Sequence, residues 1–352
     1  MKIEIELKNP LLPAEWEKHE ATYIGCPHNK NDWPGKFTPI LWVYGEIVKR
    51  ICEGEIVRIF VNDKTHEQSA IRMLRKTNAD LSNIEFIKLK TDRGWLRDSS
   101  PAFVKTNESK MQAVQFRFNG WAKYPNHKYD LRIPQTISRK YQLPLIPALH
   151  ENRHVILEGG AIDTNGRGTL ITTEECLMDT KVQVRNPGFT KTDYEEVFKK
   201  YLGITNVLWL GKGIAGDDTH GHVDDLCRFV NPNTVVIVQE NNPKDENYIS
   251  LKENRERLET MTLQDGSKVQ VVELPMPEPL YFDGQRLPAS YANFYISNAY
   301  VIVPTFNDPM DRIALGILAE LFLDRKVVGI HSVDLVWGLG TIHCLTHEHP
   351  AE

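Results

Sequence analysis

Cys344 is the residue of this sequence best suited to nucleophilic catalysis. It lies in the segment GLGTIHCLTHEHP, where Gly338 and Gly340 precede the strand-like run TIHCLT and give the thiol a flexible approach. Only the thiolate form of cysteine attacks well, and a lone cysteine is usually an inert core residue unless a base and an electropositive setting accompany it. Other parts of the chain must therefore supply a proton-transfer group.

The segment GDDTHGHVDD (216–225) is the best source of that group, because it holds four carboxylates and two histidines in ten residues. We predict an extended backbone for GHVDDLCRFV, which places His222 and Asp224 on one face of a strand and lets an imidazole and a carboxylate address one ligand. Two other interpretations stay open. One is a solvated acidic loop, and the other is a metal site built on His220, His222 and Asp224.

Two further carboxylates stand at chemically suggestive places. In GWLRDSSPAFV, Asp98 lies between Arg97 and a Ser-Ser-Pro turn that starts a strand. In HVILEGGAI, Glu158 ends a strand just before two glycines, which allow a ligand or another backbone to come close. The structural alternatives are an Arg97–Asp98 ion pair and a turn or cap role for Glu158.

The elements that must position these residues alternate between helices and strands. The sequence predicts an α/β fold with β-branched strands at 56–60, 84–89, 206–210, 268–274 and 326–330, and helices at 37–53, 63–77, 191–202, 247–261 and 309–323, with a weaker helix at 135–142. Polar groups recur after the strands at intervals of 60, 64, 71 and 51 residues, at Asp98, Glu158, His222, Asn293 and Cys344. Such spacing indicates five or six repeated units that converge on one place.

Composition limits the remaining possibilities. The chain has 352 residues and no Pro/Gly/Ser-rich linker, so we predict one domain over 1–352. The net charge of −5 without a basic block disfavours nucleic acid or an anionic membrane as partner and weakly favours a cationic ligand. With no apolar leader or membrane-length run we expect a soluble, cytoplasmic protein. Five scattered cysteines without a CxxC pair argue against disulfides and structural zinc.

Several long motifs together resemble the agmatine deiminase branch of the guanidine-modifying superfamily, whose relatives include bacterial peptidylarginine deiminase and arginine deiminase. The resemblance runs nearly end to end. It is carried by PAEWEKHEATYIGCPHNKNDWPGKF (13–37), WLRDSSPAFV, LEGGAIDTNGRGTLITTEECL (157–177), GDDTHGHVDD, LPASYANFYISN (287–298) and TIHCLT.

This resemblance implies the pentein fold, a five-fold pseudosymmetric ring of ββαβ-like units around a central active site, with neither metal nor organic cofactor. It implies Cys344 as nucleophile and His222 as general acid and base. It also implies Asp98 and Asp224 as clamps on the guanidinium and Glu158 as a further catalytic carboxylate. The expected function is hydrolysis of agmatine to N-carbamoylputrescine and ammonia through a covalent thiouronium, in a protein that relatives suggest is a homodimer.

Substrate choice is less determined. Asp217 or Asp218 is expected to receive the second positive charge of agmatine, and Trp95 to contact the substrate. The chain departs from the family pattern in reading RDSSP for RDTGP and GLGTIHC for GGGNIHC, which places Leu339 and Thr341 on the approach to the thiol. Peptidyl-arginine or free arginine is the alternative substrate.

Three other classes of protein are also compatible with these residues. A metal-dependent hydrolase would use His220, His222 and Asp224, a non-catalytic guanidine-binding protein would need only the carboxylates, and an amidinotransferase would pass the amidino group to an amine.

Carboxylates near Cys344 should raise its pKa in the free enzyme, so the thiolate is expected to form when a cationic substrate binds or His222 is protonated. The tail residues His347, Glu348 and His349 are expected to be solvated at the surface.

Overall fold

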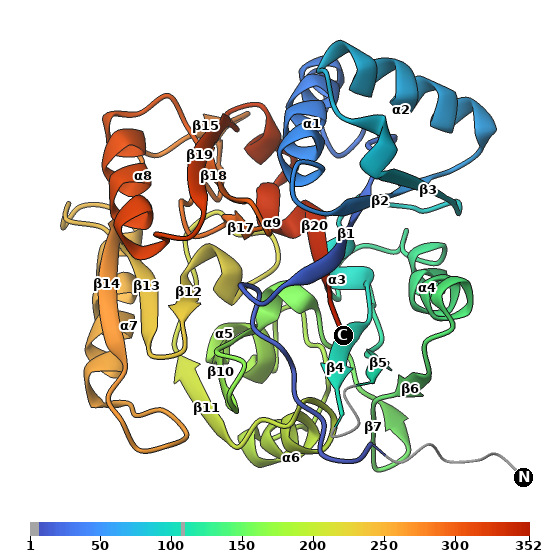
Figure 1. Ribbon diagram of the computed structural model, residues 1–352. Helices are drawn as coiled ribbons and strands as arrows, with labels where there is room; N and C mark the ends of the chain where they lie inside the picture. The colour runs from blue at the N-terminus through green and yellow to red at the C-terminus, as the bar shows by residue number, and fades with distance from the viewer. Residues whose placement is uncertain (1–6, 107–109) are drawn as a thin grey trace, which may run out of the picture.

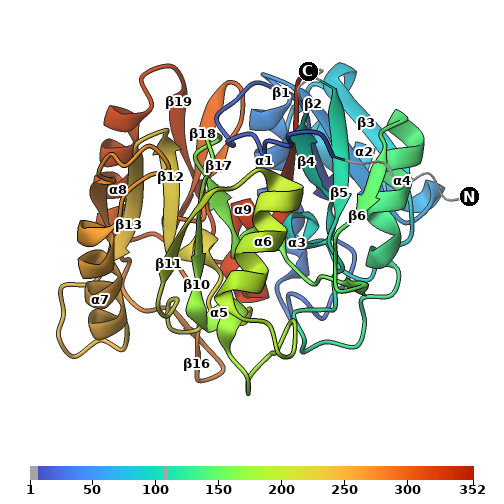
Figure 2. The same cartoon turned by 90° about the horizontal axis from the view of Figure 1, so that it is seen from below.

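The computed structural model describes residues 7–106 and 110–352, and within them five sheets share one pattern. In each sheet a strand pairs antiparallel with one neighbour and parallel with the other, and the chain makes the parallel step through at least one helix. Figures 1 and 2 place these sheets around the short helices α3 and α9, with the longer helices at the outside. The α/β fold predicted from the sequence is confirmed.

The strands of the five sheets are given in spatial order. They are β20 (Thr346–Pro350), β1 (His19–Gly25), β2 (Ile56–Val61) and β3 (Ile84–Lys88); β4 (Ala102–Lys105), β5 (Met111–Gln115) and β6 (Leu145–Pro147); β11 (Asn206–Leu210), β10 (Thr169–Thr173) and β9 (Asp163–Thr164); β12 (Cys227–Asn231), β13 (Thr234–Gln239) and β14 (Gln270–Pro275); and β17 (Tyr295–Ile296), β18 (Tyr300–Thr305) and β19 (Lys326–His331). Two small hairpins pair β7 (Leu149–His150) with β8 (Arg153–His154), and β15 (Tyr281–Phe282) with β16 (Gln285–Arg286).

The α-helices of the described residues are α1 (Phe37–Ile51), α2 (Lys64–Lys76), α3 (Leu96–Ser99), α4 (Ile133–Tyr141), α5 (Glu174–Met178), α6 (Lys191–Leu202), α7 (Asn247–Thr260), α8 (Pro309–Leu321) and α9 (Ile342–Leu345). The predicted helices and strands listed by their ranges above are all present to within a few residues. None of the described helices is long and apolar enough to cross a membrane.

Local sequence explains where the longer helices begin and end. Helix α6 starts with a capping box between Thr190 and Asp193 and ends at Gly203, whose φ of 71° suits glycine. Helix α8 starts with a second capping box, in which Asp308 and Asp311 satisfy each other's backbone N–H groups. These capping side chains accept hydrogen bonds from backbone N–H groups that have no partner within the helix, and so stabilise the first turn of each helix.

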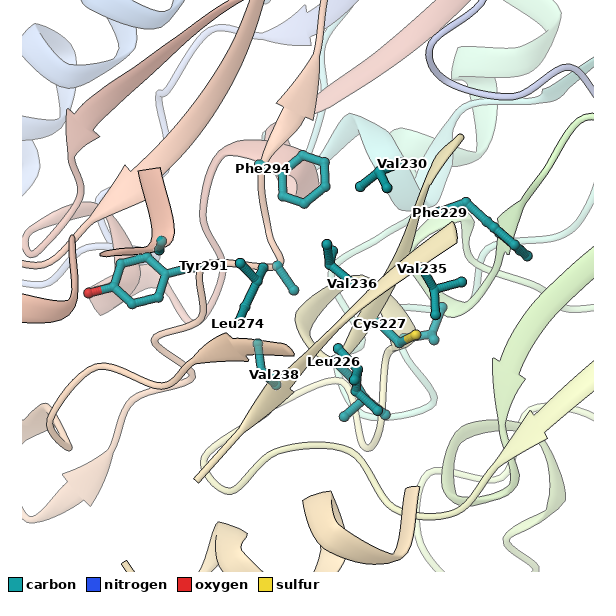
Figure 3. Packing of buried hydrophobic residues seen from close by; sticks show 14 of the residues in the cluster. Leu226, Cys227, Phe229, Val230, Val235, Val236, Val238, Leu274, Tyr291 and Phe294 are labelled. Atoms are coloured by element: carbon teal, nitrogen blue, oxygen red, sulfur yellow. The ribbon is translucent and has the colours of Figure 1, made fainter. Parts of the chain in front are cut away.

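The largest hydrophobic cluster lies around the sheet of β12, β13 and β14. Strand β13 has the run TVVIV, whose residues are all buried, as expected for a strand covered on both faces. Figure 3 shows Val236 and Val238 of this strand on the side of Leu274 of β14 and Phe294, and Val235 on the other side near Phe229. All five cysteines are free, so the expectation of unpaired thiols is confirmed.

Three local predictions were wrong. The run TIHCLT forms the one-turn helix α9 before β20, because the backbone N–H of His343 bonds to Asn293 instead of to a neighbouring strand. His222 precedes a 3₁₀ turn over Val223–Asp225, and strand pairing begins only at Cys227.

The third wrong prediction is that Glu158 ends a strand. Glu158 lies outside the strands given above and directly precedes the 3₁₀ turn Gly159–Ala161.

The charged tail is also not at the surface. His347 and His349 are buried in β20, where His347 Nε2 bonds to a backbone carbonyl at 2.9 Å and the His349 ring stacks on Phe103 at 4.5 Å. Glu348 pairs with the buried guanidinium of Arg97 at 2.7 Å. The expected surface solvation is therefore wrong, because this strand closes the first sheet against β1.

Truncation of the core should be costly. Leu274→Ala removes a fully buried side chain and should lower the free energy of unfolding by about 2–5 kcal/mol, measured by urea denaturation. Leu323→Ala is the matched control, since Leu323 is 89% exposed and its loss should change stability by no more than about 0.5 kcal/mol. Equal effects of the two substitutions would contradict this assignment of the core.

Candidate active site

The five predicted catalytic residues lie in one buried cluster, although they come from distant parts of the chain. Cys344 is 7% exposed, and the other four, Asp98, Glu158, His222 and Asp224, are 4% exposed or less. Cys344 Sγ lies 3.7 Å from Asp224 Oδ2. His222 Nδ1 lies 3.9 Å from both Asp98 Oδ1 and Asp224 Oδ1, and its Nε2 lies 4.0 Å from Glu158 Oε2.

The backbone around Cys344 is held by Asn293. The side-chain oxygen of Asn293 accepts a bond from the backbone N–H of His343 at 3.1 Å and from Thr341 Oγ1 at 2.6 Å, while its amide nitrogen lies 3.2 Å from Cys344 Sγ. Thr341 is therefore a buried support of the loop and is absent from the lining of the cavity above the thiol. The sequence pattern places Asn293 at a repeat position but does not indicate this role.

The acidic loop before His222 is rigid because one carboxylate ties it together. Asp217 Oδ2 accepts bonds from the backbone N–H groups of Gly221 and His222 at 2.7 and 2.9 Å, and Oδ1 accepts two bonds from Thr219. Both oxygens of Asp217 are thus committed to their own loop. A backbone held in this way cannot enter the strand ladder, which explains why the predicted strand starts later.

Asp98 is oriented from two sides. Its Oδ2 accepts a bond from the indole N–H of Trp121 at 2.8 Å, and its Oδ1 accepts one from the backbone N–H of Gly160 at 3.0 Å. A Cβ at Gly160 would lie 2.5 Å from His222 Nδ1, so glycine is needed there to admit the ring. The predicted Arg97–Asp98 alternative is wrong, because Arg97 turns away to Glu15 and Glu348.

Glu158 has a cationic partner that sequence reasoning missed. Arg185 Nε lies 3.2 and 3.3 Å from its two oxygens, and both side chains are fully buried. Arg185 also donates to the backbone carbonyls of Gln183 and Thr219, which tie the pair to neighbouring loops. A buried carboxylate that pairs with a fixed guanidinium keeps its orientation.

Asp224 is held by His343, the residue before the nucleophile. Its Oδ2 lies 2.7 Å from His343 Nδ1, and Nε2 of the same ring lies 2.7 Å from Glu15 Oε2. The ring of His343 therefore bridges the carboxylates of Asp224 and Glu15. Arg97 and Arg228 also pair with Glu15, so a charged network runs from the N-terminal segment to the site.

These surroundings shift the titration of the reacting groups. Burial raises the pKa of Cys344 well above its ordinary value, and the carboxylates of Asp224, Asp225 and Asp98 raise it further, as the sequence predicted. Burial alone would lower the pKa of His222, but Asp98, Cys176 and Asp224 raise it well above the ordinary value. The free site therefore holds a neutral thiol beside a protonated imidazole.

A cavity of about 300 Å³ leads to this cluster and is lined by Cys344, Asp98 and several aromatic side chains. Trp95 and Leu339 line it as expected. Asp218 lines it too, but Lys123 Nζ and the Tyr124 hydroxyl already bond to its carboxylate at 2.5 and 2.6 Å. The other aromatic residues are Trp121, Tyr124, Phe282 and Trp337.

The metal site considered from the sequence does not converge. His220 Nε2 lies 2.8 Å from Asp179 Oδ2, with its backbone at a φ of 65°. Among residues 7–106 and 110–352, the group of three potential metal ligands that contains His222 is completed by Glu158 and Cys176, not by His220 and Asp224. The three residues proposed as ligands therefore do not form one coordination sphere.

The raised pKa of the thiol has a measurable consequence. Alkylation of Cys344 by iodoacetamide in the free protein should be slow near pH 7 and accelerate with a midpoint above the ordinary cysteine value, because only the thiolate reacts. Asp224→Asn removes one negative charge beside the sulfur and should shift the midpoint to lower pH, as followed by peptide mass spectrometry. Asp265→Asn, at an exposed site, is the control. A midpoint that Asp224→Asn leaves unchanged would contradict this electrostatic picture.

The comparisons with known proteins agree with this geometry. The family of Porphyromonas-type peptidyl-arginine deiminases matches residues 11–350. Agmatine deiminase of Pseudomonas aeruginosa is 32% identical, with 97% of this chain and 95% of that protein covered. Agmatine deiminase of Enterococcus faecalis has a TM-score of 0.88 at 28% identity, with 97% and 96% covered. A cysteine-to-serine variant of C. jejuni agmatine deiminase with substrate bound has a TM-score of 0.84 at 29% identity, with the same coverage. The chain belongs to the Porphyromonas-type peptidyl-arginine deiminase family.

Proposed function

We propose that this protein is a guanidine deiminase that hydrolyses agmatine to N-carbamoylputrescine and ammonia. The observation that carries the proposal is a buried thiol faced by the carboxylates of Asp98 and Asp224, with the imidazole of His222 within 3.9 Å of both. Acidic groups around a nucleophile repel anions and select a planar cation. The relatives named as agmatine deiminases, one of them with substrate bound, support this choice.

The guanidinium would lie with its N–H edges on Asp98 and Asp224, which fixes its carbon for attack. Binding of the cation lowers the pKa of Cys344, the thiol proton leaves to solvent, and the thiolate Sγ then adds to the carbon. His222 gives its proton to the departing nitrogen as the C–N bond breaks. Ammonia leaves, and a cationic thiouronium remains on the sulfur while the imidazole is neutral.

Water completes the reaction. Neutral His222 takes one proton from the attacking water, the C–O bond forms, and the C–S bond breaks to return the thiolate. The remaining hydroxyl proton leaves through the acidic cluster, where we assign Glu158 as the acceptor. The net reaction converts guanidinium and water into a ureido group and an ammonium ion.

We further propose that Asp218 receives the distal ammonium of agmatine, while the aromatic walls, with Trp95 among them, enclose its methylene chain. Asp218 lines the cavity, whereas the oxygens of Asp217 serve the loop. Lys123 competes for the same carboxylate. A substrate with a free carboxylate, such as arginine, would place a negative charge near Asp218 and is disfavoured.

We also propose that residues 1–352 form one domain in which the five sheets make a five-fold pseudosymmetric propeller. The shared strand pattern of the sheets supports this arrangement. It explains why residues spaced by roughly equal intervals meet at one centre. The homodimer remains a prediction, which light scattering would test.

The central experiment measures ammonia and ureido product from agmatine, L-arginine and a peptide with C-terminal arginine. We expect the highest kcat/KM with agmatine, and we expect Cys344→Ala to reduce it by about 10⁴-fold or more, since nucleophile and base act as one unit. Cys52→Ala removes a remote thiol and serves as control. Full activity of Cys344→Ala, or activity abolished by a chelator, would favour the metal-dependent alternative instead.

The assignment of Asp218 predicts opposite effects from two substitutions. Asp218→Asn should raise the KM for agmatine by about fivefold, corresponding to one partly solvated charge pair of about 1 kcal/mol. Lys123→Met frees the Asp218 carboxylate and should lower this KM. The KM for L-arginine, measured by steady-state kinetics, provides the comparison. If both substitutions changed the KM for agmatine and the KM for L-arginine by the same factor, Asp218 would not be the ammonium acceptor.

A further inference from the structure

Cys176 is a second thiol at the edge of the cluster, and the proposed reaction does not use it. It is 1% exposed and lies in helix α5, where Thr173 Oγ1 accepts the bond from its backbone N–H at 3.1 Å. The same hydroxyl donates to the backbone carbonyl of Gly221 at 2.5 Å, which joins this turn to the loop of His222. The thiol is thus held in a fixed place next to the imidazole.

Three potential ligand atoms converge there. One from each of Glu158, Cys176 and His222 lies within 4.8 Å of the others, and all three residues are buried. His222 Nε2 faces Glu158 Oε2 at 4.0 Å and has no hydrogen-bond partner although it is buried. An unpartnered buried nitrogen aimed at a carboxylate and a thiol has the chemistry of an open coordination site.

We propose that Glu158, Cys176 and His222 bind a thiophilic divalent cation such as Zn²⁺, and that its binding stops turnover. Sulfur, imidazole and carboxylate together suit Zn²⁺ or Co²⁺ and disfavour Mg²⁺, which prefers oxygen ligands. Tetrahedral Zn–N and Zn–S bonds of about 2.0–2.3 Å put donor atoms about 3.3–3.7 Å apart, so the three donors, now within 4.8 Å of one another, must draw together by up to about 1.5 Å. On binding, the S–H bond of Cys176 is replaced by a sulfur–metal bond, and its proton and any proton on Nε2 leave to solvent.

The charges nearby tolerate such a cation. Arg185 beside Glu158 opposes it, but Asp98 and Asp224 lie 3.9 Å from the other nitrogen of His222. The metal would occupy Nε2 and one carboxylate and leave Cys344 free. Inhibition would therefore come from loss of the acid–base group, and this part of the inference rests on the proposed function. Binding itself does not.

Cobalt binding to Cys344→Ala tests the site without the competing nucleophile. We expect one Co²⁺ per chain with a sulfur-to-cobalt charge-transfer band in the ultraviolet. Adding Cys176→Ser should abolish the band and weaken binding by about tenfold or more. The matched control adds Cys227→Ala, which removes a buried thiol outside the group formed by Glu158, Cys176 and His222, and should retain the band.

X-ray absorption on zinc-loaded Cys344→Ala makes the test independent of how well the double variant folds, and one sulfur with nitrogen and oxygen ligands is expected. No bound metal, no sulfur ligand, or a band that survives Cys176→Ser would overturn the site. Zn²⁺ should also inhibit the wild type, and Cys176→Ser should need about tenfold more Zn²⁺ for half-inhibition relative to its own metal-free rate. If the wild type and Cys176→Ser were equally sensitive to Zn²⁺, the inhibitory role would be overturned. If Cys344→Ala bound cobalt as expected but the wild type had no deiminase activity, only the proposed function would be refuted.

Discussion

The crowding of buried carboxylates around one thiol is the constraint on which the site depends. Two of these carboxylates have fixed basic partners: His343 for Asp224 and Arg185 for Glu158. Asp98 is held by an indole and a backbone N–H group and faces only the imidazole of His222, and burial raises its pKa. Among the described residues, Asp98 therefore has no cationic side chain hydrogen-bonded to it. A bound guanidinium would add a positive charge there, and its arrival would favour both the carboxylate and the thiolate forms that the reaction needs.

The fold meets this constraint by bringing loop and turn residues, rather than strand residues, to one place. Asp98 lies in α3, Cys344 in α9, and His222 directly before a 3₁₀ turn. Helices α3 and α9 lie at the middle of the molecule (Figure 1). Such turns have few hydrogen bonds of their own, so side chains such as Asn293 and Asp217 hold their backbone. The same arrangement that positions these groups also leaves the buried His222 Nε2 without a hydrogen-bond partner in the described part of the chain, and the adjacent Cys176 thiol is the basis of the metal binding that we propose.

Sequence patterns predicted the helices and strands well, because amphipathic periodicity and β-branched runs mark elements that pack on both sides. Together with the family resemblance, they also indicated five candidate reacting residues, which the structure brings into one buried cluster. They failed where tertiary contacts override local preference: TIHCLT forms a one-turn helix because Asn293 accepts a hydrogen bond from the backbone N–H of His343, 50 residues later. The partners Arg185 and His343 were missed since a single arginine or histidine carries no local signal of burial, and the polar tail looked exposed because the pairing of Glu348 with Arg97 joins distant segments.

Covalent attachment of substrate carbon to Cys344 is the central claim and can be observed directly. Wild-type protein is mixed with agmatine carrying a ¹³C label in the guanidinium carbon, quenched rapidly with acid during turnover, digested and analysed by mass spectrometry. The account predicts a labelled thiouronium adduct on the peptide that contains Cys344. Release of labelled product with no adduct at any quench time, or with the adduct on another residue, would contradict it.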